Sequence, residues 1–249
     1  MKKNLLIIGG TSGIVIPCYE RFLKDYNISA TYSEQKNLNK IPKKIRKKNI
    51  KFFKLNFNDS DYEIIETLKE ANIKPDIIIN SVGGSFGIKE YSFDLNDWKK
   101  LLEMNCLKHI LINNFFLKRM KKKKFGRILF FSSMAVDDPN GPIVYSVSKS
   151  FLENYVKKSA LLFGKYNIFI NCIKTSIIAA KNNNWYKATK QKPQKVKKMM
   201  KRLISIGRIG NSHDLIDLIL LISSKRNKFI NGSIIKADGG VKYPDWKID

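Results

Sequence analysis

The sequence predicts an α/β protein built as a single domain on a doubly wound parallel sheet, with helices on both faces. Three observations favour this fold. Short apolar runs at residues 5–8, 128–131 and 168–173 each predict a buried strand, and helical patterns separate such runs along the chain. The first run opens directly into a glycine-rich turn followed by a helical pattern. Finally, a length of 249 residues suits one undivided α/β domain.

The glycine-rich turn has the sequence GGTSGI at residues 9–14. Such a turn lets main-chain N–H groups approach a pyrophosphate at a helix N-terminus, where the helix dipole favours negative charge. Pro17 follows closely, and proline is tolerated only in the first turn of a helix. We therefore expect the helix to begin near Gly13 or Ile14, with a dinucleotide bound over the turn.

The segment from Phe130 to Lys149 carries the most reactive combination of side chains. The strand at 128–131 places Ser132 and Ser133 at its C-terminal end, where open α/β sheets bind their ligands. After a turn-rich loop at 137–142, Tyr145 and Lys149 lie four residues apart on a predicted helix, so their side chains share one face. A fixed ammonium beside a phenol stabilises the phenolate, which suits general acid–base catalysis.

A serine pair at a strand end, followed about a dozen residues later by Tyr-x-x-x-Lys, resembles the short-chain dehydrogenase/reductase family. Within it, the chain is most similar to the 3-oxoacyl-carrier-protein-reductase-like subgroup. Further family landmarks follow in order: Gly9 and Gly13, Asn80-Ser81-Val82-Gly83, Asn105, Asn171-Cys172-Ile173, and Ala237-Asp238-Gly239-Gly240. The resemblance covers nearly the whole chain and implies one Rossmann-type domain over residues 1–249. It also implies hydride transfer between a nicotinamide cofactor and a carbonyl or alcohol substrate.

The resemblance implies a role for four catalytic residues. Tyr145 would be the general acid/base, and Lys149 would assist it and hold the nicotinamide ribose. Asn105 would position a water in the proton relay. Ser133 would hydrogen-bond the carbonyl oxygen. Ser132 stays an alternative to Ser133, because the interval to Tyr145 is one residue shorter than is usual in the family.

The cofactor-binding residues that the resemblance implies lie on several strand ends. They are Gly9, Thr11, Ser12, Gly13, Ile14, Ser33, Asn56, Phe57, Asn80, Val82, Gly83, Tyr145, Lys149, Thr175 and Ile178. Family members that bind NAD offer a carboxylate after the second strand, whereas Thr31, Tyr32 and Ser33 stand there in this chain. The basic residues Lys36, Lys40, Lys43, Lys44 and Arg46 follow. We therefore expect NADP, with NAD as the alternative.

Two positions depart from the family pattern. Val15 replaces the third glycine of the turn, and Thr175-Ser176 replaces a Pro-Gly pair near the nicotinamide. A side chain at Val15 is expected to crowd the pyrophosphate, since glycine there serves close approach. These departures leave a second hypothesis open, a non-catalytic protein that binds a dinucleotide through degenerate motifs.

Residues 176–206 correspond to the mobile substrate lid of the family. From Pro193 a helix is predicted with Val196, Met199, Met200 and Leu203 on one side, which we expect to close over the pocket. Lysines cover its other side. They favour an anionic or carrier-bound substrate, drawn to the lid by a field that salt would screen. The alternative is that these lysines are simply solvated.

The net charge of +26 comes from 47 basic residues, of which only seven are arginine. Because lysine is abundant throughout the chain, composition bias explains most of this charge, and no DNA- or RNA-binding motif accompanies it. The hypothesis that the protein associates with a membrane or a nucleic acid is supported only by its charge. No apolar run reaches the roughly 20 residues that span a bilayer, and no signal peptide precedes the first strand. We expect a cytoplasmic protein with neither a membrane nor a nucleic acid as partner.

The three cysteines, Cys18, Cys106 and Cys172, are far apart and form no CxxC pair. This argues against a disulfide framework and against a metal site, so we expect reduced core residues. The resemblance further implies a homotetramer or homodimer, joined through the helices that carry Asn105 and Tyr145.

Overall fold

The computed structural model describes residues 2–88, 91–181 and 183–242. Its centre is a seven-stranded parallel sheet in the order β3-β2-β1-β4-β5-β6-β9, so the strand order reverses between β1 and β4. The strands are β1 (Lys3–Ile8), β2 (Tyr26–Tyr32), β3 (Ile50–Lys54), β4 (Ile77–Asn80), β5 (Gly126–Ser133), β6 (Ile168–Thr175) and β9 (Ile234–Ala237). The predicted doubly wound sheet is confirmed.

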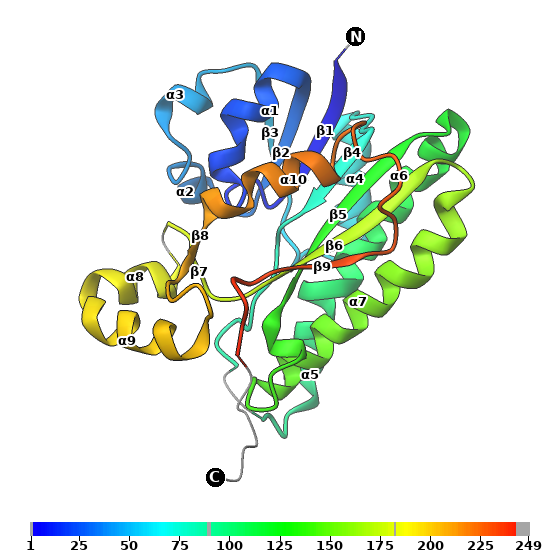
Figure 1. Ribbon diagram of the computed structural model, residues 1–249. Helices are drawn as coiled ribbons and strands as arrows, with labels where there is room; N and C mark the ends of the chain where they lie inside the picture. The colour runs from blue at the N-terminus through cyan, green and yellow to red at the C-terminus, as the bar shows by residue number, and fades with distance from the viewer. Residues whose placement is uncertain (1, 89–90, 182, 243–249) are drawn as a thin grey trace.

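Helices cover both faces of this sheet (Figure 1). One face carries α1 (Tyr19–Asp25) and α10 (Ile216–Ile222), and the other carries α4 (Asp61–Ala71), α6 (Lys108–Lys123) and α7 (Ile143–Gly164). Two cores result, because successive strand side chains point to opposite faces. Leu5 and Ile7 pack in the core beneath α1, whereas Leu6 and Ile8 pack in the core beneath α4, α6 and α7.

The helix after the glycine turn begins later than the sequence predicted. Residues 16–18 form a short 3-10 turn (Ile16–Cys18), and α1 starts only at Tyr19. Tight turns occupy the preceding residues, where Ser12 donates its N–H to Gly9 O at 2.9 Å and Ser12 O accepts the N–H of Val15 at 3.1 Å. The third strand, β3, is short. It ends at Lys54, which leaves 55–58 as a loop at the C-terminal edge of the sheet.

The long helical stretch that carries Asn105 is interrupted. It consists of α5 (Leu95–Leu102), a π-helical segment (Glu103–Leu107) and α6. A π-helical segment inserts an extra residue into the turn and is frequent at functional sites. This one contains Asn105, the residue that the sequence singled out on this helix.

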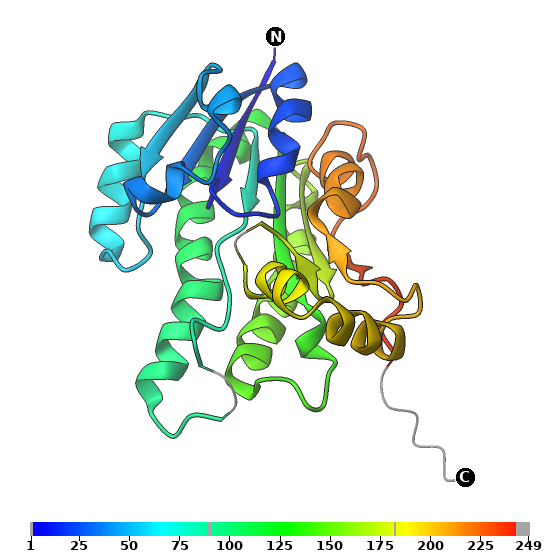
Figure 2. The same ribbon diagram turned by 90° about the vertical axis from the view of Figure 1, so that its left-hand side faces the viewer.

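A smaller subdomain follows β6 and stands in front of the C-terminal edge of the sheet, facing the viewer in Figure 2. It comprises β7 (Ile178–Ala179), α8 (Asn184–Gln191), α9 (Pro193–Leu203) and β8 (Gly210–Asn211), with β7 and β8 paired in parallel. We call α8 and α9 the lid helices. The remaining short helices are α2 (Gln35–Leu38), α3 (Lys43–Arg46), and 3-10 turns at Met134–Val136 and Ser212–Leu215.

Within the described residues, no helix is both long and apolar enough to cross a membrane. Cys18, Cys106 and Cys172 are all free and buried, as predicted. Burial raises the pKa of each of these thiols to about 12. They are therefore inert core residues rather than nucleophiles.

Candidate active site

The end of β5 and one face of α7 meet at the C-terminal edge of the sheet. Lys149 is buried and donates a hydrogen bond of 2.9 Å from Nζ to the main-chain oxygen of Phe131. The same Nζ lies 5.8 Å from the ring centre of Tyr145, one turn earlier on α7. Tyr145 is half-buried. The structure thus brings the predicted phenol and ammonium together beside the strand that carries the two serines.

The two serines have different surroundings. Ser132 is 3% exposed and donates its hydroxyl proton to Glu153 Oε1 at 2.6 Å. Ser133 is half-buried, and its Oγ accepts the N–H of Ala135 at 3.2 Å. Because Ser133 Oγ acts only as an acceptor in this contact, its own proton can still be donated to a substrate oxygen. This geometry favours Ser133 over Ser132 as the substrate-facing hydroxyl.

Asn105 is fully buried, and its carboxamide holds the loop that follows β4. Its Nδ2 donates to Gly84 O at 3.0 Å and to Leu101 O at 3.1 Å, and its Oδ1 accepts the N–H of Gly84 at 2.9 Å. Both amide protons are therefore used, and one lone pair of Oδ1 can accept a further hydrogen bond. Gly83 has φ of +151°. Only glycine adopts this conformation readily.

Two further polar residues extend this contact along the same helix face. His109 places Nδ1 3.1 Å from Asn80 Oδ1 and Nε2 2.9 Å from Val82 O, while Asn113 donates to Asn80 Oδ1 at 2.9 Å. Asn105, His109 and Asn113 are spaced four residues apart, and all are buried. Neither His109 nor Asn113 was among the site residues predicted from the sequence. The signal for Asn113 was polar spacing in step with Asn105.

A groove of about 580 Å³ runs along the sheet edge where the strand order reverses. Many of the predicted cofactor residues line it, namely Gly9, Thr11, Ser12, Ser33, Asn56, Phe57, Val82 and Gly83. Phe86, Lys100 and Met104 also line it and were not predicted. The other predicted cofactor residues do not line this groove; they are Gly13, Ile14, Asn80, Tyr145, Lys149, Thr175 and Ile178. Asn80 is 2% exposed, and its Nδ2 donates to the main-chain oxygen of Leu129 on β5 at 3.3 Å.

Gly9 and Gly13 are constrained by different neighbours. Gly9 has φ of +79°, and a Cβ there would lie 2.7 Å from Cγ2 of Val82. A Cβ at Gly13 would instead lie 2.8 Å from the Ala180 side chain and 2.9 Å from Lys181 O. Gly13 is therefore required by the chain segment that leads into the lid helices. The sequence pattern alone assigned it only to phosphate approach.

Val15 does not crowd the groove, contrary to expectation. Its side chain is fully buried in the core beneath α1, together with Tyr19 and Phe22. The 3-10 turn that precedes α1 directs Val15 into this core, and Val15 does not line the groove. The valine at this position therefore contributes to the core and does not obstruct the groove.

Most of the basic residues after β2 do not line the groove. Lys36 pairs with Glu34 at 2.6 Å, Lys44 pairs with Glu20 at 2.6 Å, and Arg46 donates to Asn39 at 3.1 Å. Only Lys40 of the predicted cluster lines the groove. It does so beside Ser33 and Asn37, whose side chains are hydrogen-bonded at 3.0 Å.

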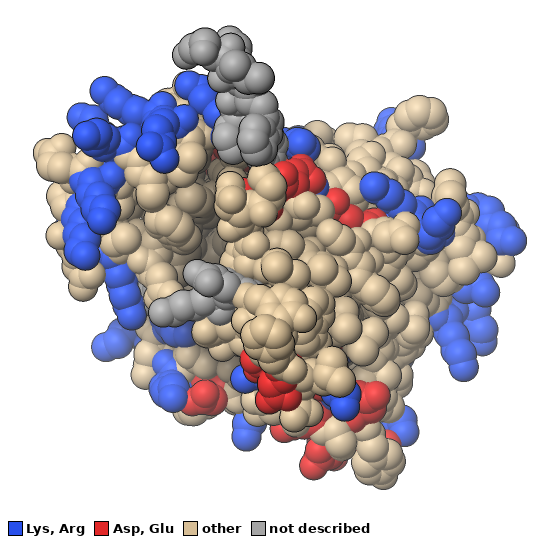
Figure 3. Space-filling model, turned by 90° about the horizontal axis from the view of Figure 1, so that it is seen from below, with Lys and Arg blue, Asp and Glu red and all other residues tan. Residues whose placement is uncertain are grey.

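The lid helices enclose a small core of their own. Val196 and Met200 are buried with Ile204, against the partly buried Ile177 and Ile209. The expectation that the apolar side of α9 closes over the pocket therefore fails for these residues, because the packing of α9 on its neighbours already consumes that side. The other side is basic. Lysine and arginine gather on the left of Figure 3, where the lid helices lie in Figure 1.

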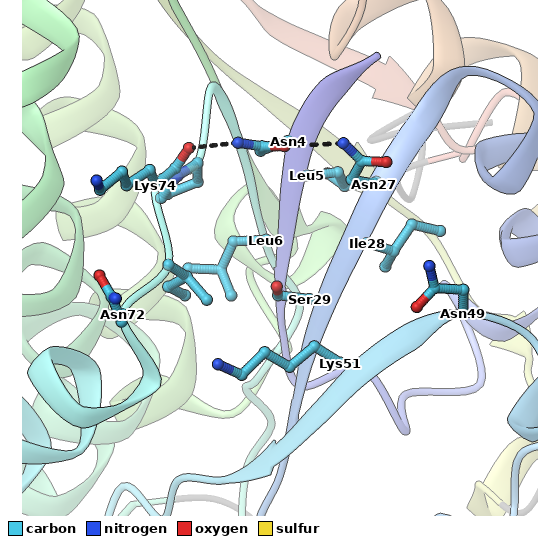
Figure 4. A pocket seen from close by; sticks show the side chains of 12 residues that line it. Asn4, Leu5, Leu6, Asn27, Ile28, Ser29, Asn49, Lys51, Asn72 and Lys74 are labelled. Atoms are coloured by element: carbon cyan, nitrogen blue, oxygen red, sulfur yellow. Dashed lines mark hydrogen bonds between the residues drawn. The ribbon is translucent and has the colours of Figure 1, made fainter. Parts of the chain in front are cut away.

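A second cavity, of about 380 Å³, lies at the opposite end of the strands (Figure 4). Asparagines from several segments line it, and Asn4 donates to Lys74 O at 3.0 Å and accepts from Asn27 at 3.2 Å. It contains none of the predicted catalytic or cofactor residues. The groove at the C-terminal edge is therefore the candidate site, as expected for an open α/β sheet.

This fold, with a glycine turn and a groove at the strand-order reversal, is typical of a dinucleotide-binding protein. A family model described as enoyl-(acyl carrier protein) reductase matches residues 24–242. The chain belongs to the short-chain dehydrogenase/reductase family, whose members are NAD(P)-dependent oxidoreductases.

Individual relatives agree with this assignment. The 3-oxoacyl-(acyl-carrier-protein) reductase FabG of Buchnera aphidicola subsp. Schizaphis graminum is 27% identical and covers 96% of this chain and 97% of its own length. The L-rhamnose 1-dehydrogenase (NADP⁺) of Thermoplasma acidophilum is 26% identical and covers 96% of both chains. The solved structure of ElxO with NADP bound has a TM-score of 0.83 at 25% identity, covering 96% of this chain and 98% of the other.

Proposed function

We propose that this chain transfers a hydride between NADP and a carbonyl or alcohol substrate, with Tyr145 as the general acid/base. One observation carries the proposal. Lys149 is bonded to the carbonyl of Phe131 at 2.9 Å and lies beside the Tyr145 ring, so the helix bearing the phenol is joined to the strand bearing Ser133. A proton donor and an oxygen-binding hydroxyl thereby flank one position at the sheet edge.

Each catalytic residue has a stated task in this proposal. Ser133 Oγ donates a hydrogen bond to the substrate oxygen, and the Tyr145 hydroxyl gives that oxygen its proton in the direction of reduction. Lys149 stabilises the tyrosinate that remains and holds the nicotinamide ribose. Asn105 Oδ1 keeps a lone pair for a water that returns the proton. When bound, the nicotinamide supplies or accepts the hydride.

The groove fits a dinucleotide in shape and lining. Its volume lies within the range of cofactor sites. The turn at 9–12 supplies a glycine with positive φ and two hydroxyl side chains at its wall. Gly9, Thr11 and Ser12 would hold the pyrophosphate, while Asn56 and Phe57 would hold the adenine. Because Val15 packs in the core, it gives no support to the non-catalytic alternative.

NADP is favoured over NAD by the end of the groove near β2. Ser33, Asn37 and Lys40 line it there, and together they offer a hydroxyl, an amide and a cation to a 2′-phosphate. Glu34 also lines this end, but Lys36 pairs with it. Replacing Lys40 with glutamine should weaken NADPH about tenfold and leave NADH unchanged, as one charged contact predicts. Fluorescence titrations with the two cofactors measure this, and equal losses for both would contradict the assignment.

The substrate class is proposed from the lid and the relatives. Residues 176–206 contain nine basic residues and no acidic one. Since relatives include 3-oxoacyl-carrier-protein reductases, we propose an anionic or carrier-bound 3-oxoacyl thioester. After cofactor titration, NADPH oxidation with acetoacetyl-coenzyme A and NADP⁺ reduction with rhamnose or a hydroxysteroid test this choice. Turnover of the sugar or steroid alone would overturn it.

We further propose a cytoplasmic homo-oligomer. Large apolar side chains are exposed along α7 and just before α6, namely Leu107, Val147, Phe151, Leu161 and Leu162. Such a surface on a charged protein is typical of a contact between subunits. Light scattering should show a dimer or tetramer, and Phe151→Glu should shift it toward the monomer. A monomeric wild-type protein would contradict the proposal.

A further inference from the structure

A cluster of charged side chains lies at the ends of β5 and β6, outside the predicted catalytic set. Lys174, on β6, is 4% exposed and reaches Asp137 Oδ1 at 2.8 Å and Glu153 Oε1 at 3.0 Å. Lys236, on β9, reaches Asp137 Oδ2 at 3.1 Å. Two ammonium groups and two carboxylates therefore balance. The sequence analysis singled out none of these residues.

This cluster is bonded to the chain segments immediately before and after Ser133. Glu153 accepts the hydroxyl proton of Ser132 at 2.6 Å, immediately before Ser133. Asp137 is the C-cap residue of the 3-10 turn at Met134–Val136, and Ser133 is its N-cap residue. Lys174 joins these two carboxylates across the gap between β5 and β6. Lys174 is thus connected to the chain on both sides of Ser133, through Glu153 and Ser132 before it and through Asp137 after it.

The same helix face carries the proposed acid and this cluster. Tyr145, Lys149 and Glu153 follow each other at intervals of four residues on α7, so they lie in one row. Lys149 bonds Phe131 O, and Glu153 bonds Ser132 Oγ. Residues on two successive turns of α7 therefore form hydrogen bonds with two successive residues of β5. This sets the position of Ser133 relative to Tyr145.

Electrostatics keep Lys174 and Asp137 charged. Burial alone would lower the pKa of Lys174, but hydrogen bonds and charges from Asp137 and Glu153 outweigh it and raise the pKa. Burial likewise opposes ionisation of Asp137, yet Lys174 and Lys236 hold the pKa of that carboxyl below its usual value. Buried ion pairs add little net stability compared with apolar residues. Their position beside the proposed substrate-binding hydroxyl therefore indicates a geometric role.

We infer that Glu153 and Lys174 are positioning residues for the proposed substrate-binding serine. Glu153 holds Ser132 in the wall of the sheet, and because strand side chains alternate, this turns Ser133 toward the substrate. Lys174 neutralises Glu153 and anchors the following turn through Asp137. This inference rests on the proposed function, since it assigns the task to Ser133.

Lys174→Met, a substitution of similar length without charge, tests the inference. It leaves Glu153 buried without its cation, so the bond to Ser132 should be disrupted and Ser133 displaced. With NADPH and acetoacetyl-coenzyme A, kcat should fall about tenfold to a hundredfold, as small misplacements do, while KM for NADPH stays unchanged. Glu153→Gln added to Lys174→Met removes the unbalanced charge but keeps an oxygen for Ser132. The double variant should therefore have a much higher kcat than Lys174→Met. Lys174→Arg alone keeps a cation and should have a kcat near that of wild type.

Lys108→Met is the matched control. Lys108 is a buried lysine that pairs with Asp61 at 2.7 Å, but it lies outside the groove and the charge cluster. The Lys108→Met variant should have a lower melting temperature than wild type but the same kcat. If Lys174→Met behaves like Lys108→Met, or if the double variant is no better than Lys174→Met, the positioning role is overturned.

Crystal structures of wild type, Lys174→Met and Lys108→Met give a measurement that needs no turnover. The 3.2 Å contact between Ser133 Oγ and Ala135 N should be lost only in Lys174→Met. An unchanged contact in that variant would refute the inference whatever the substrate. Conversely, full turnover by Tyr145→Phe would refute the proposed function and leave this structural test standing.

Discussion

Asn105 and Lys149 converge on one point although they come from different helices. A Cβ at Gly83 would lie 2.7 Å from Asn105 Oδ1 and 3.0 Å from Lys149 Nζ. The amide and the ammonium therefore share the space beside the loop after β4, and a glycine is required between them. Residues expected to take part in one proton path are thus neighbours in the structure.

Tyr145→Phe should abolish most turnover. The change removes one half-buried hydroxyl and little packing, so the melting temperature and NADPH affinity should stay near those of wild type. Loss of a positioned proton donor lowers kcat by roughly 100-fold or more. NADPH oxidation, fluorescence titration and thermal melting measure the three quantities. Wild-type kcat in this variant would exclude Tyr145 as the acid.

The two serines should respond differently to alanine. Ser133→Ala should lower kcat by about tenfold or more and leave stability unchanged, because its hydroxyl makes one weak contact with Ala135. Ser132→Ala removes a buried donor to Glu153 and should cost about 1–3 kcal/mol of unfolding free energy. Parallel urea denaturation and kinetics separate the two effects. A stable, inactive Ser132→Ala paired with an active Ser133→Ala would exchange their roles.

Val15→Gly should destabilise the protein rather than tighten dinucleotide binding. The valine is fully buried in the core beneath α1, so its removal leaves a cavity and adds backbone freedom. We expect a loss on the order of 2–4 kcal/mol in unfolding free energy. Val15→Ala should give a smaller loss. Stronger NADPH binding by Val15→Gly would show that Val15 crowds the cofactor after all.

The lid lysines give a test of the anionic substrate. Lys197, Lys198 and Lys201 lie on α9, and changing all three to glutamine should raise KM for acetoacetyl-coenzyme A. The dependence of KM on salt should also flatten, because exposed charges act through a field that salt screens. The matched control replaces Lys121, Lys122 and Lys123 at the end of α6, far from the groove. Equal effects of both sets of substitutions on KM would show that the lid lysines reflect composition bias and do not attract the substrate.

His109 should make stability depend on pH. Burial first, and the nearby Lys149 charge, lower its pKa to about 3 from an ordinary 6.5, although the Val82 carbonyl favours the charged form. Between these values the unfolded chain binds more protons than the folded one, so stability falls as pH falls. His109→Gln should weaken the decline of melting temperature between pH 6.5 and the acid range. His213→Gln, at the exposed second histidine, should leave the slope unchanged.

Local sequence patterns were sufficient to predict the sheet of this protein and the position of its candidate site. Apolar runs, the glycine turn and the four-residue spacing of Tyr145 and Lys149 each depend on neighbours in sequence, so the sheet, its groove and the helix face of α7 could be predicted. Even the departure at Val15 could be recognised. Its consequence could not, because that depends on whether the side chain enters the groove or the core.

Tertiary structure alone decided which polar groups meet. Lys174, Glu153 and Asp137 are distant in sequence, and the pairing of β5 with β6 brings them together. The π-helical segment at Asn105 and the contact of Gly13 with Ala180 likewise arise from packing between segments. Hydrogen bonds and ion pairs need atoms within a few ångströms. Sequence spacing supplies that proximity along one helix, whereas between strands only the folded chain does.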